Sequence, residues 1–358
     1  MMDKIGISLI WVFWMMSVSA VEGQIISEYN PTHGSTFDRV NKRGYVICGT
    51  NDEFPGFSRE SWSSEDGSRW GGFDVDICRA IAAAMFGDAE AIEFTIVNGK
   101  TRFEFLIDGS IDILSAATTY TFTRNVAKKL EFMPTTFYDG QGFIVRKTLG
   151  VSSAKQMEGA RICFSGTGTA AKNIADFMEL HGISYIPVAV KSTEKTKNVY
   201  KRGDCDMYGT DRSGLASNRL SFDDPDRHMI LPEIISKEPL GPVVRYGDQK
   251  WSDVIRWTVY VLFIAEEMGI NSQNIDSFKN NIDPNIQRFM GEKNGKDHPH
   301  LGAKLGLGAT WSYNIIKQVG NYREIYERNV GENTSLGLKR GLNRLYNHGG
   351  LLYAPPLK

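Results

Sequence analysis

Short apolar runs alternate along the first third of the chain with segments in which apolar residues recur every three or four positions. The runs are typical of buried strands and the periodic segments of helices. They predict strands over residues 45–50, 92–97 and 111–114, a helix that begins at Phe73, and a second helix over residues 102–108. Strands that alternate with helices favour an α/β unit with a mostly parallel sheet.

The same alternation restarts after residues 143–146. It predicts further elements in chain order: a strand at 161–164, a helix at 169–180, a strand at 185–190, a helix at 193–201, a strand at 205–208 and a helix that opens after Thr210. Residues 239–246 are typical of an extended crossing, and the chain beyond Trp251 is rich in helical patterns. Two α/β units joined by extended crossings predict two lobes with a ligand site between them, at the carboxyl ends of the strands.

The N-terminus has the pattern of a secretory signal peptide. One cation precedes a nearly uninterrupted apolar run at residues 5–16, and Val18-Ser-Ala20 fits a small-x-small cleavage site. We predict a signal peptide at 1–20, a flexible lead-in at 21–36 and export to the periplasm. The run is short for a membrane anchor, which is the alternative. Another apolar run, at residues 259–265, is bounded by charges and is interpreted as a buried helix.

Composition narrows the possible partners. The 358 residues include 41 basic and 42 acidic side chains, so no bulk attraction to nucleic acid or to an anionic membrane is expected. The four cysteines are Cys48, Cys78, Cys163 and Cys205. An even number in an exported chain suggests two disulfides with three possible pairings, of which we favour Cys48–Cys78 and Cys163–Cys205 because each would staple one lobe. Free buried thiols are the alternative.

A candidate anion site follows the third predicted strand. The strand runs into Ala116-Ala-Thr-Thr119, and Arg124 lies five residues beyond the second threonine. A planar guanidinium with neutral donors beside it suits a carboxylate, which it can bind through two oxygens at once. Judged locally, a threonine-rich loop with a surface arginine explains the same residues.

Asp211 is a candidate for the opposite charge. It follows a predicted strand and precedes a predicted helix, so its carboxylate could cap that helix or could face the cleft and accept an ammonium group. Taken together, Arg124 and Asp211 would form a receptor for a zwitterion, with the carboxylate held by one lobe and the amine by the other.

Gly166-Thr-Gly-Thr-Ala-Ala171 follows a strand and opens a helix, which formally fits a dinucleotide-binding fingerprint. A true fingerprint has an acidic residue at the end of the next strand, whereas here that strand ends in Val190-Lys191. We therefore expect no dinucleotide. The segment retains the ability to bind an anion at a helix start, and capping by Thr167 or Thr169 is the simpler alternative.

Signals for catalysis or metal binding are weak. The chain has no zinc-protease, serine-hydrolase or phosphate-loop motif, and residues 297–300 fit a solvated loop better than a metal site. We predict no enzyme activity, no cofactor and no metal.

The chain resembles the periplasmic substrate-binding proteins of polar amino acid ABC transporters, in particular the general L-amino acid-binding branch of solute-binding protein family 3. The similar segments are residues 72–84, Thr118-Thr-Tyr-Thr-Phe-Thr-Arg124, 138–143, Tyr208-Gly-Thr-Asp-Arg-Ser-Gly-Leu215, 231–242, 313–328 and 340–343. The resemblance implies a type II periplasmic binding protein fold, in which residues 37–141 plus 239–358 form one lobe and 142–238 the other. It further implies a monomer that closes over one free L-amino acid and delivers it to a membrane permease.

The resemblance also implies roles for individual residues. Arg124 would bind the ligand α-carboxylate and Asp211 the α-ammonium group. The remaining expected ligand residues are Thr118, Thr119, Gly168 and Thr169 beside the carboxylate, Phe54 packed on the ligand, and Arg102 at the position that acidic amino acid binders use for a side-chain carboxylate.

The sequence departs from this branch at three places. Ala117 stands where an asparagine is usual, Gly168 replaces a threonine, and Ala170 replaces a glutamate. These changes remove side-chain groups, so a shifted or narrowed ligand range is expected. Two rival hypotheses are an exported dehydratase-like enzyme that uses Glu53 or Asp139 as its acid or base, and the sensing module of a receptor.

Overall fold

The computed structural model describes residues 34–52, 54–60, 70–292 and 300–358. The predicted signal peptide, the lead-in up to residue 33, Glu53 and residues 297–299 of the predicted solvated loop lie outside these ranges. None of the helices in the described ranges is long and apolar enough to cross a membrane.

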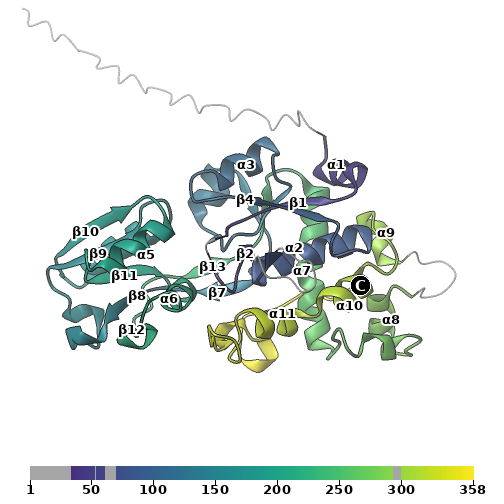
Figure 1. Cartoon of the computed structure of the whole chain (residues 1–358). Helices are drawn as coiled ribbons and strands as arrows, with labels where there is room; N and C mark the ends of the chain where they lie inside the picture. The colour runs from purple at the N-terminus through teal and green to yellow at the C-terminus, as the bar shows by residue number, and fades with distance from the viewer. Residues whose placement is uncertain (1–33, 53, 61–69, 293–299) are drawn as a thin grey trace, which may run out of the picture. The chain divides into compact units, whose positions relative to one another are not determined.

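The first lobe is built on a five-stranded sheet in the order β4-β1-β5-β14-β6. Figure 1 labels its strands β4 and β1. Its strands are β1 (Val46–Thr50), β4 (Ile92–Ile96), β5 (Ile113–Leu114), β6 (Leu130–Phe132) and β14 (Val243–Arg245). All run parallel except β14, which is antiparallel to both of its neighbours. A separate short pair consists of β2 (Arg59–Glu60) and β3 (Trp70–Gly71).

The second lobe repeats this plan in the order β10-β9-β11-β8-β12. Its strands are β8 (Gln141–Arg146), β9 (Ala160–Ser165), β10 (Tyr185–Val190), β11 (Met207–Asp211) and β12 (His228–Ile230). Here β8 is the antiparallel strand. In each sheet the antiparallel strand is the one that follows a crossing, because the chain enters the lobe from the opposite direction.

The two crossings are β7 (Phe137–Asp139) and β13 (Glu238–Leu240), which pair antiparallel with each other. The predicted fold class is thus confirmed: two lobes, each a mostly parallel sheet with helices, joined by two crossing strands. The predicted crossing at 239–246 includes β14 and all of β13 except Glu238. The residues at which each lobe begins and ends stay a prediction.

Helices cover both sheets. Those of the first lobe are α1 (Thr36–Arg43), α2 (Phe73–Phe86), α3 (Arg102–Asp108), α7 (Gln249–Glu267), α8 (Pro284–Met290), α9 (Leu301–Leu305), α10 (Trp311–Val319) and α11 (Tyr322–Asn329), and those of the second are α4 (Ala170–Leu180), α5 (Thr193–Arg202) and α6 (Arg212–Arg219). Short helical turns are a π-helical turn at Thr123–Ala127 and 3₁₀ turns at Lys147–Leu149, Ala154–Gln156, Pro225–Arg227, Ile275–Phe278, Gly341–Asn343 and Tyr346–His348.

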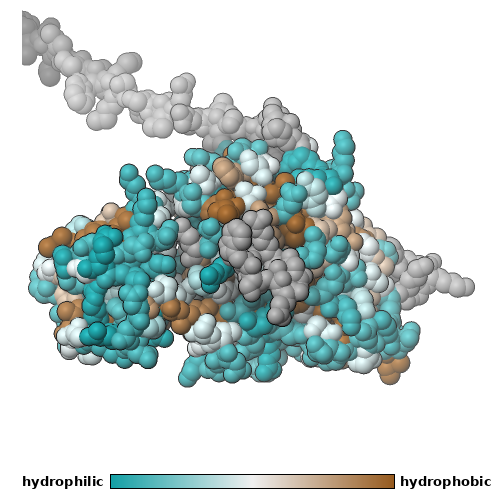
Figure 2. Space-filling model, viewed as in Figure 1, coloured by the Kyte–Doolittle hydropathy of each residue, from teal (hydrophilic) through white to brown (hydrophobic). Residues whose placement is uncertain are grey.

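The core of each lobe is apolar. In the first lobe α2 and α7 are buried along most of their length, and residues 259–265 belong to α7 as a buried segment, which confirms the interpretation of that apolar run. The second lobe has its own clusters around Phe143, Ile174 and Leu215. On the face shown in Figure 2 the described surface is mostly hydrophilic, with scattered hydrophobic patches.

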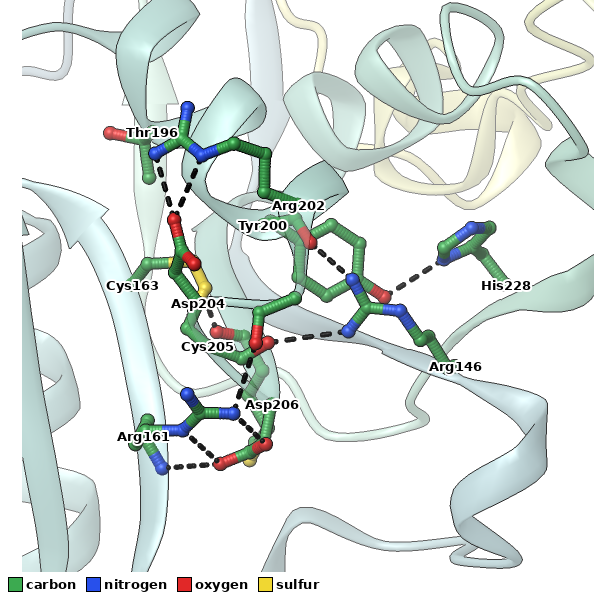
Figure 3. The surroundings of a disulfide bond; sticks show 12 residues. Arg146, Arg161, Cys163, Thr196, Tyr200, Arg202, Asp204, Cys205, Asp206 and His228 are labelled. Carbon is green, nitrogen blue, oxygen red and sulfur yellow. Dashed lines mark hydrogen bonds and ion pairs between the residues drawn. A yellow bond between two sulfur atoms is a disulfide. The ribbon is translucent and has the colours of Figure 1, made fainter.

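Both favoured disulfides are confirmed. Cys48–Cys78 joins β1 to α2, with a Cα–Cα distance of 6.4 Å. Cys163 on β9 is linked to Cys205 just before β11, with a Cα–Cα distance of 5.8 Å. Charged contacts surround the second bond (Figure 3), among them Arg161 with Asp206, whose closest nitrogen–oxygen distance is 2.8 Å. Each disulfide therefore staples one lobe.

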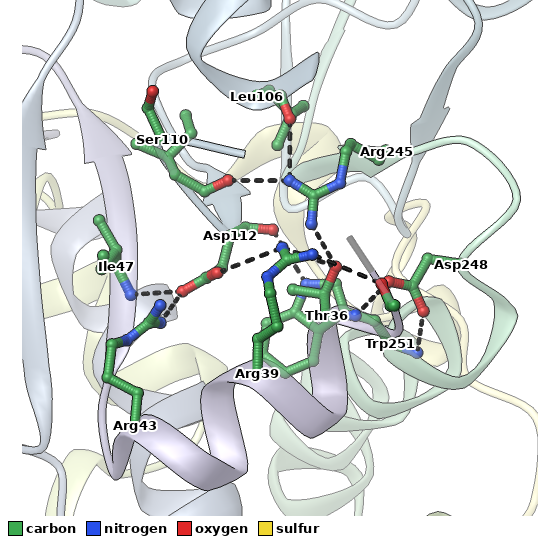
Figure 4. A network of polar contacts seen from close by, with 12 residues as sticks. Thr36, Arg39, Arg43, Ile47, Leu106, Ser110, Asp112, Arg245, Asp248 and Trp251 are labelled. Atoms are coloured by element: carbon green, nitrogen blue, oxygen red, sulfur yellow. Dashed lines mark hydrogen bonds and ion pairs between the residues drawn. The ribbon is translucent and has the colours of Figure 1, made fainter. Parts of the chain in front are cut away.

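An N-terminal helix that the sequence did not predict is fixed to the first sheet by charge (Figure 4). Arg43 of α1 bonds the Asp112 carboxylate, which also accepts a hydrogen bond from the backbone N–H of Ile47 at 2.8 Å. The backbone N–H of Thr36 donates to Asp248 at 2.7 Å. The lead-in expected to reach residue 36 is wrong at its end, because α1 already begins at Thr36.

Candidate functional site

A pocket of about 650 Å³ is lined by residues of both lobes. All but one of the residues expected to bind the ligand line it: Phe54, Arg102, Thr119, Arg124, Gly168, Thr169 and Asp211. The exception is Thr118, which is fully buried and whose hydroxyl accepts a hydrogen bond from Arg102 at 3.4 Å. Thr118 thus supports a pocket residue from behind.

Arg124 is nearly buried, with 8% of its surface exposed. It lies in the π-helical turn after the threonine-rich loop, and its Nη1 donates to the Thr119 carbonyl at 2.7 Å. Burial lowers the pKa of Arg124, while the negative charges of Glu238 and Asp211 oppose that shift. Because its guanidinium forms no salt bridge with any described residue, its remaining donors are available to an anion in the pocket.

Arg102 is the first residue of α3 and stacks over the Phe103 ring at 4.8 Å from the ring centroid. Its Nε is buried without a hydrogen-bond partner in the described part of the chain. Burial and the positive charge of Arg124 lower the pKa of Arg102 to about 9. Two guanidiniums therefore share one pocket, and a buried cation without a counter-ion is costly unless the ligand supplies one.

Asp211 is the last residue of β11 and lines the pocket from the second lobe. Burial raises the pKa of Asp211 well above the ordinary value, and the charges of Asp139 and Glu238 raise it further, while Arg124 and Arg102 act in the opposite direction. Its carboxylate does not cap α6. Of the two roles that the sequence left open, helix capping is therefore wrong.

The cap of α6 is provided by Asp139 instead. The Asp139 carboxylate accepts hydrogen bonds from the backbone N–H of Ser213 at 3.1 Å and from the Ser213 hydroxyl. Asp139 lies on the crossing strand β7 and is not among the residues that line the pocket. This arrangement leaves the Asp211 carboxylate free for a ligand.

Glu238 is a site residue that sequence reasoning missed. It is 1% exposed on the crossing strand β13 and accepts hydrogen bonds from Ser236 at 2.7 Å and Asn173 at 2.8 Å. The Thr169 hydroxyl also donates to it, at 3.3 Å, and so does not cap α4. Glu238 thus orients the start of α4 toward the pocket. The other residues of β13 are Pro239 and Leu240, so the charge of Glu238 within that strand was the available signal.

Asp74 shapes the loop behind the ligand position. Its carboxylate accepts hydrogen bonds from the Ser115 hydroxyl at 3.0 Å and from the backbone N–H of Ala117 at 2.8 Å. Ala117 lines the pocket and has a φ of 42°, in the left-handed region that favours glycine or asparagine. Burial raises the pKa of Asp74 to about 6. The Asp74 contacts therefore hold Ala117 in an unfavourable conformation.

The two lobes approach each other on both sides of the pocket. On one side, a Cβ added at Gly214 would lie 3.6 Å from the Phe54 ring, which stacks on Phe57. On the other side, a Cβ added at Gly99 would collide with the Thr167 side chain. Gly168, by contrast, has open space around its Cα. At both places the two lobes come close together, with little room for a side chain at Gly99.

Residues 46–332 match the family described as bacterial extracellular solute-binding proteins, family 3. The chain belongs to this family. It is 46% identical over 324 residues to the general L-amino acid-binding periplasmic protein AapJ of Rhizobium johnstonii, covering 90% of this chain and 93% of AapJ. It is 42% identical over 325 residues to the glutamate/glutamine/aspartate/asparagine-binding protein BztA of Rhodobacter capsulatus, covering 90% and 94% of the two chains.

Solved structures support the same family assignment. An ABC transporter periplasmic binding protein from Brucella ovis with glutathione bound has a TM-score of 0.86 and 42% identity, covering 91% of this family 3 chain and 100% of the other. A cysteine-binding protein from Campylobacter jejuni shares the fold alone, with a TM-score of 0.55 and 19% identity over 70% of this chain and 96% of its own. The family expected from the sequence is confirmed.

Proposed function

We propose that this chain binds a free L-amino acid in the periplasm by closure of its two lobes and delivers it to the permease of an ABC transporter. One observation carries the proposal. Arg124 and Asp211 line the same pocket from different lobes, and neither side chain forms a salt bridge with a described residue. An α-amino acid supplies one carboxylate and one ammonium group, which are the two counter-ions that this pair lacks.

The roles of the site residues follow from their positions. Arg124 binds the α-carboxylate, with Thr119, Gly168 and Thr169 beside it, and Asp211 accepts hydrogen bonds from the ammonium group. Phe54 packs against the ligand. Its ring lies close to Gly214 of the other lobe. Arg102, with its unpartnered Nε, binds an anionic or carbonyl group of the ligand side chain. Thr118 acts through Arg102.

Closure is the step that makes binding tight. In an open cleft both charges are hydrated, so their contacts with a zwitterion are weak. When the lobes meet at Gly99 and Thr167, water is excluded and the charge-assisted hydrogen bonds strengthen. A permease can then distinguish the closed form from the open one.

Relatives support the ligand class. AapJ is named for general L-amino acid binding and BztA for glutamate, glutamine, aspartate and asparagine. The Brucella ovis structure holds glutathione, whose γ-glutamyl end has the same α-amino acid group. We further propose that the protein acts as a monomer without cofactor, metal or nucleic acid, that residues 1–20 are a cleaved signal peptide, and that 37–141 plus 239–358 and 142–238 are the moving lobes.

The enzyme hypothesis is less well supported. Of its two candidate acid–base residues, Asp139 is occupied in capping α6, and Glu53 lies outside the described residues. The relatives AapJ and BztA are both named as amino acid-binding proteins.

A ligand panel tests the proposal. Purified protein is screened by thermal unfolding against the common L-amino acids, their D-enantiomers, and analogues of the best ligand that lack the amine or the carboxylate. Since tight binding raises the melting temperature by mass action, we expect shifts with L-amino acids and none with either truncated analogue. Equal shifts with a truncated analogue would refute the zwitterion site. Chemical conversion of a bound ligand, followed by NMR, would favour an enzyme.

A further inference from the structure

Three lysines line one side of the pocket: Lys100 from the first lobe, and Lys191 and Lys195 from the second. All three are exposed, and none of their ammonium groups forms a hydrogen bond or salt bridge with a described residue. No described acidic side chain therefore neutralises these cations.

The fold brings the lysines to the place where the lobes touch. Lys100 adjoins Gly99, and Gly99 abuts Thr167 of the other lobe. The backbone N–H of Gly166 donates to the Val190 carbonyl at 2.9 Å, which sets Lys191 beside the same loop. Lys195 lies in the first turn of α5, four residues further along the chain. Closure of the lobes therefore brings Lys100 toward two other positive charges.

The charge of the described residues that line the pocket exceeds what a single amino acid neutralises. The described lining residues include five cations (Lys100, Arg102, Arg124, Lys191 and Lys195) and two anions (Asp52 and Asp211), a balance of 5 − 2 = +3. A zwitterion with a neutral side chain leaves this balance unchanged. A ligand with additional carboxylates reduces it, and lowers the repulsion that opposes closure.

We infer that Lys100, Lys191 and Lys195 form a second subsite, which binds the distal carboxylate of an elongated ligand such as a short γ-glutamyl peptide. The inference rests on the proposed function, since the α-amino acid head of that ligand occupies Arg124 and Asp211. The cavity of about 650 Å³ is large enough, because pockets of roughly 300–1,000 Å³ hold ligands well above the size of a free amino acid. The distal carboxylate bridges cations of both lobes and thereby favours the closed state.

Two matched probes measure how much the distal carboxylate of the ligand contributes to binding. One is S-methylglutathione, whose blocked thiol cannot exchange with the protein disulfides, and the other is its glycine ethyl ester, which has the same head without the distal charge. Calorimetric titration at low salt should give about tenfold tighter binding for the acid than for the ester. The difference should shrink at high salt because the lysines are exposed to solvent.

A triple variant tests whether the three lysines cause the difference in affinity between the acid and the ester. In K100Q/K191Q/K195Q the acid should bind no better than the ester, whereas glutamine should bind at least as tightly as it does to wild type, because the loss of three cations lowers the repulsion between the lobes. The control K147Q/K155Q/K304Q alters exposed lysines away from the pocket and should behave as wild type. Thermal unfolding verifies that each variant folds, and the acid–ester comparison in wild type needs no variant.

The outcomes distinguish a failure of the lysine subsite from a failure of the proposed function. Equal affinities of wild type for acid and ester, or an acid preference that survives in the triple variant, would overturn the lysine subsite. Binding of free amino acids without any peptide binding would also overturn it and leave the proposed function intact. Failure of both amino acids and peptides to bind would reject the proposed function itself.

Discussion

The Asp139 carboxylate accepts a hydrogen bond from the backbone N–H of Ser213 at 3.1 Å, so a crossing strand caps the helix that follows Asp211. The cap that Asp211 would otherwise provide is thereby taken, and the charge of Asp139 raises the pKa of Asp211. The crossing strand β7 and Asp211, the proposed ammonium acceptor, are thus coupled through the start of α6.

Replacing Asp139 should affect stability and binding together. We expect Asp139→Ala to lower the free energy of unfolding by about 1–2 kcal/mol because α6 loses its cap. Affinity for an amino acid should also fall, since Asp211 is then drawn toward the free helix start. Urea unfolding and calorimetry measure the two effects. The control Asp226→Ala removes an exposed carboxylate that forms no hydrogen bond or salt bridge with a described residue, and it should change neither quantity. Unchanged stability of Asp139→Ala would contradict the capping role.

Ligand affinity should depend on pH through Asp211. Burial and the charges of Asp139 and Glu238 raise the pKa of Asp211, and Arg124 and Arg102 oppose them. An ammonium ligand requires the ionised carboxylate, so affinity is highest above the raised pKa and falls as pH decreases through it. Binding should then release a proton, which calorimetry detects in buffers of different ionisation enthalpy. Asp211→Asn should bind weakly with a flat pH profile. An equally steep profile in this variant would assign the titration to another group.

The left-handed backbone conformation of Ala117 can be tested by substitution. Left-handed backbone costs a non-glycine residue roughly 1–2 kcal/mol, and asparagine tolerates it better. We expect Ala117→Asn to raise the free energy of unfolding by up to about 1 kcal/mol and to change ligand preference, because its amide adds a donor in the pocket. Lys129, with a φ of 52° outside the pocket lining, provides the matched control. Lys129→Asn should stabilise similarly without any effect on binding. An equal effect of both variants on ligand preference would exclude a pocket role for residue 117.

The contact at Gly99 should limit closure. A side chain at this position collides with Thr167, so Gly99→Val should weaken binding while the stability of the ligand-free protein is unchanged. Thr167→Gly in the same molecule removes the obstacle and should restore affinity. Gly308→Ala, where a Cβ meets open space, is the neutral control. Calorimetry provides the affinities, and small-angle scattering the compaction on ligand addition. Full compaction of Gly99→Val would show that the lobes close elsewhere.

Local patterns were sufficient for most elements of the fold. The helix α3 and the strand β10 have the bounds that periodicity predicted, and β11 ends three residues later than predicted, at Asp211. That extension matters, because it brings Asp211 to the carboxyl end of the sheet, where a ligand site is expected. Helix α1 escaped prediction because it is only 8 residues long and its apolar pattern is limited to Phe37 and Val40. Contacts with the distant Asp112 and Asp248 hold it in place.

The charged residues of the candidate site were predictable from the sequence, whereas the residues that hold them in position were less so. Arg124 and Asp211 were recognisable because each follows a strand and carries one of the charges that a zwitterion needs. Besides its neighbour Ser236, Glu238 binds Asn173, which lies 65 residues away. Asp139 binds Ser213, 74 residues away, and Asp74 binds partners 41 and 43 residues away. Such long-range hydrogen bonds leave no periodic signal in the sequence, which is why these three roles emerged only from the folded chain.

The central claim is that Arg124 binds the ligand carboxylate, and calorimetric titration of Arg124→Ala tests it most directly. The ligand is the amino acid with the largest thermal shift in wild type, and the control is Arg202→Ala, an exposed arginine paired with Asp204. Loss of the buried partner should cost roughly 2–5 kcal/mol, which weakens binding about 30-fold or more. The control should bind as wild type does. Wild-type affinity in Arg124→Ala, with its fold intact, would contradict the account.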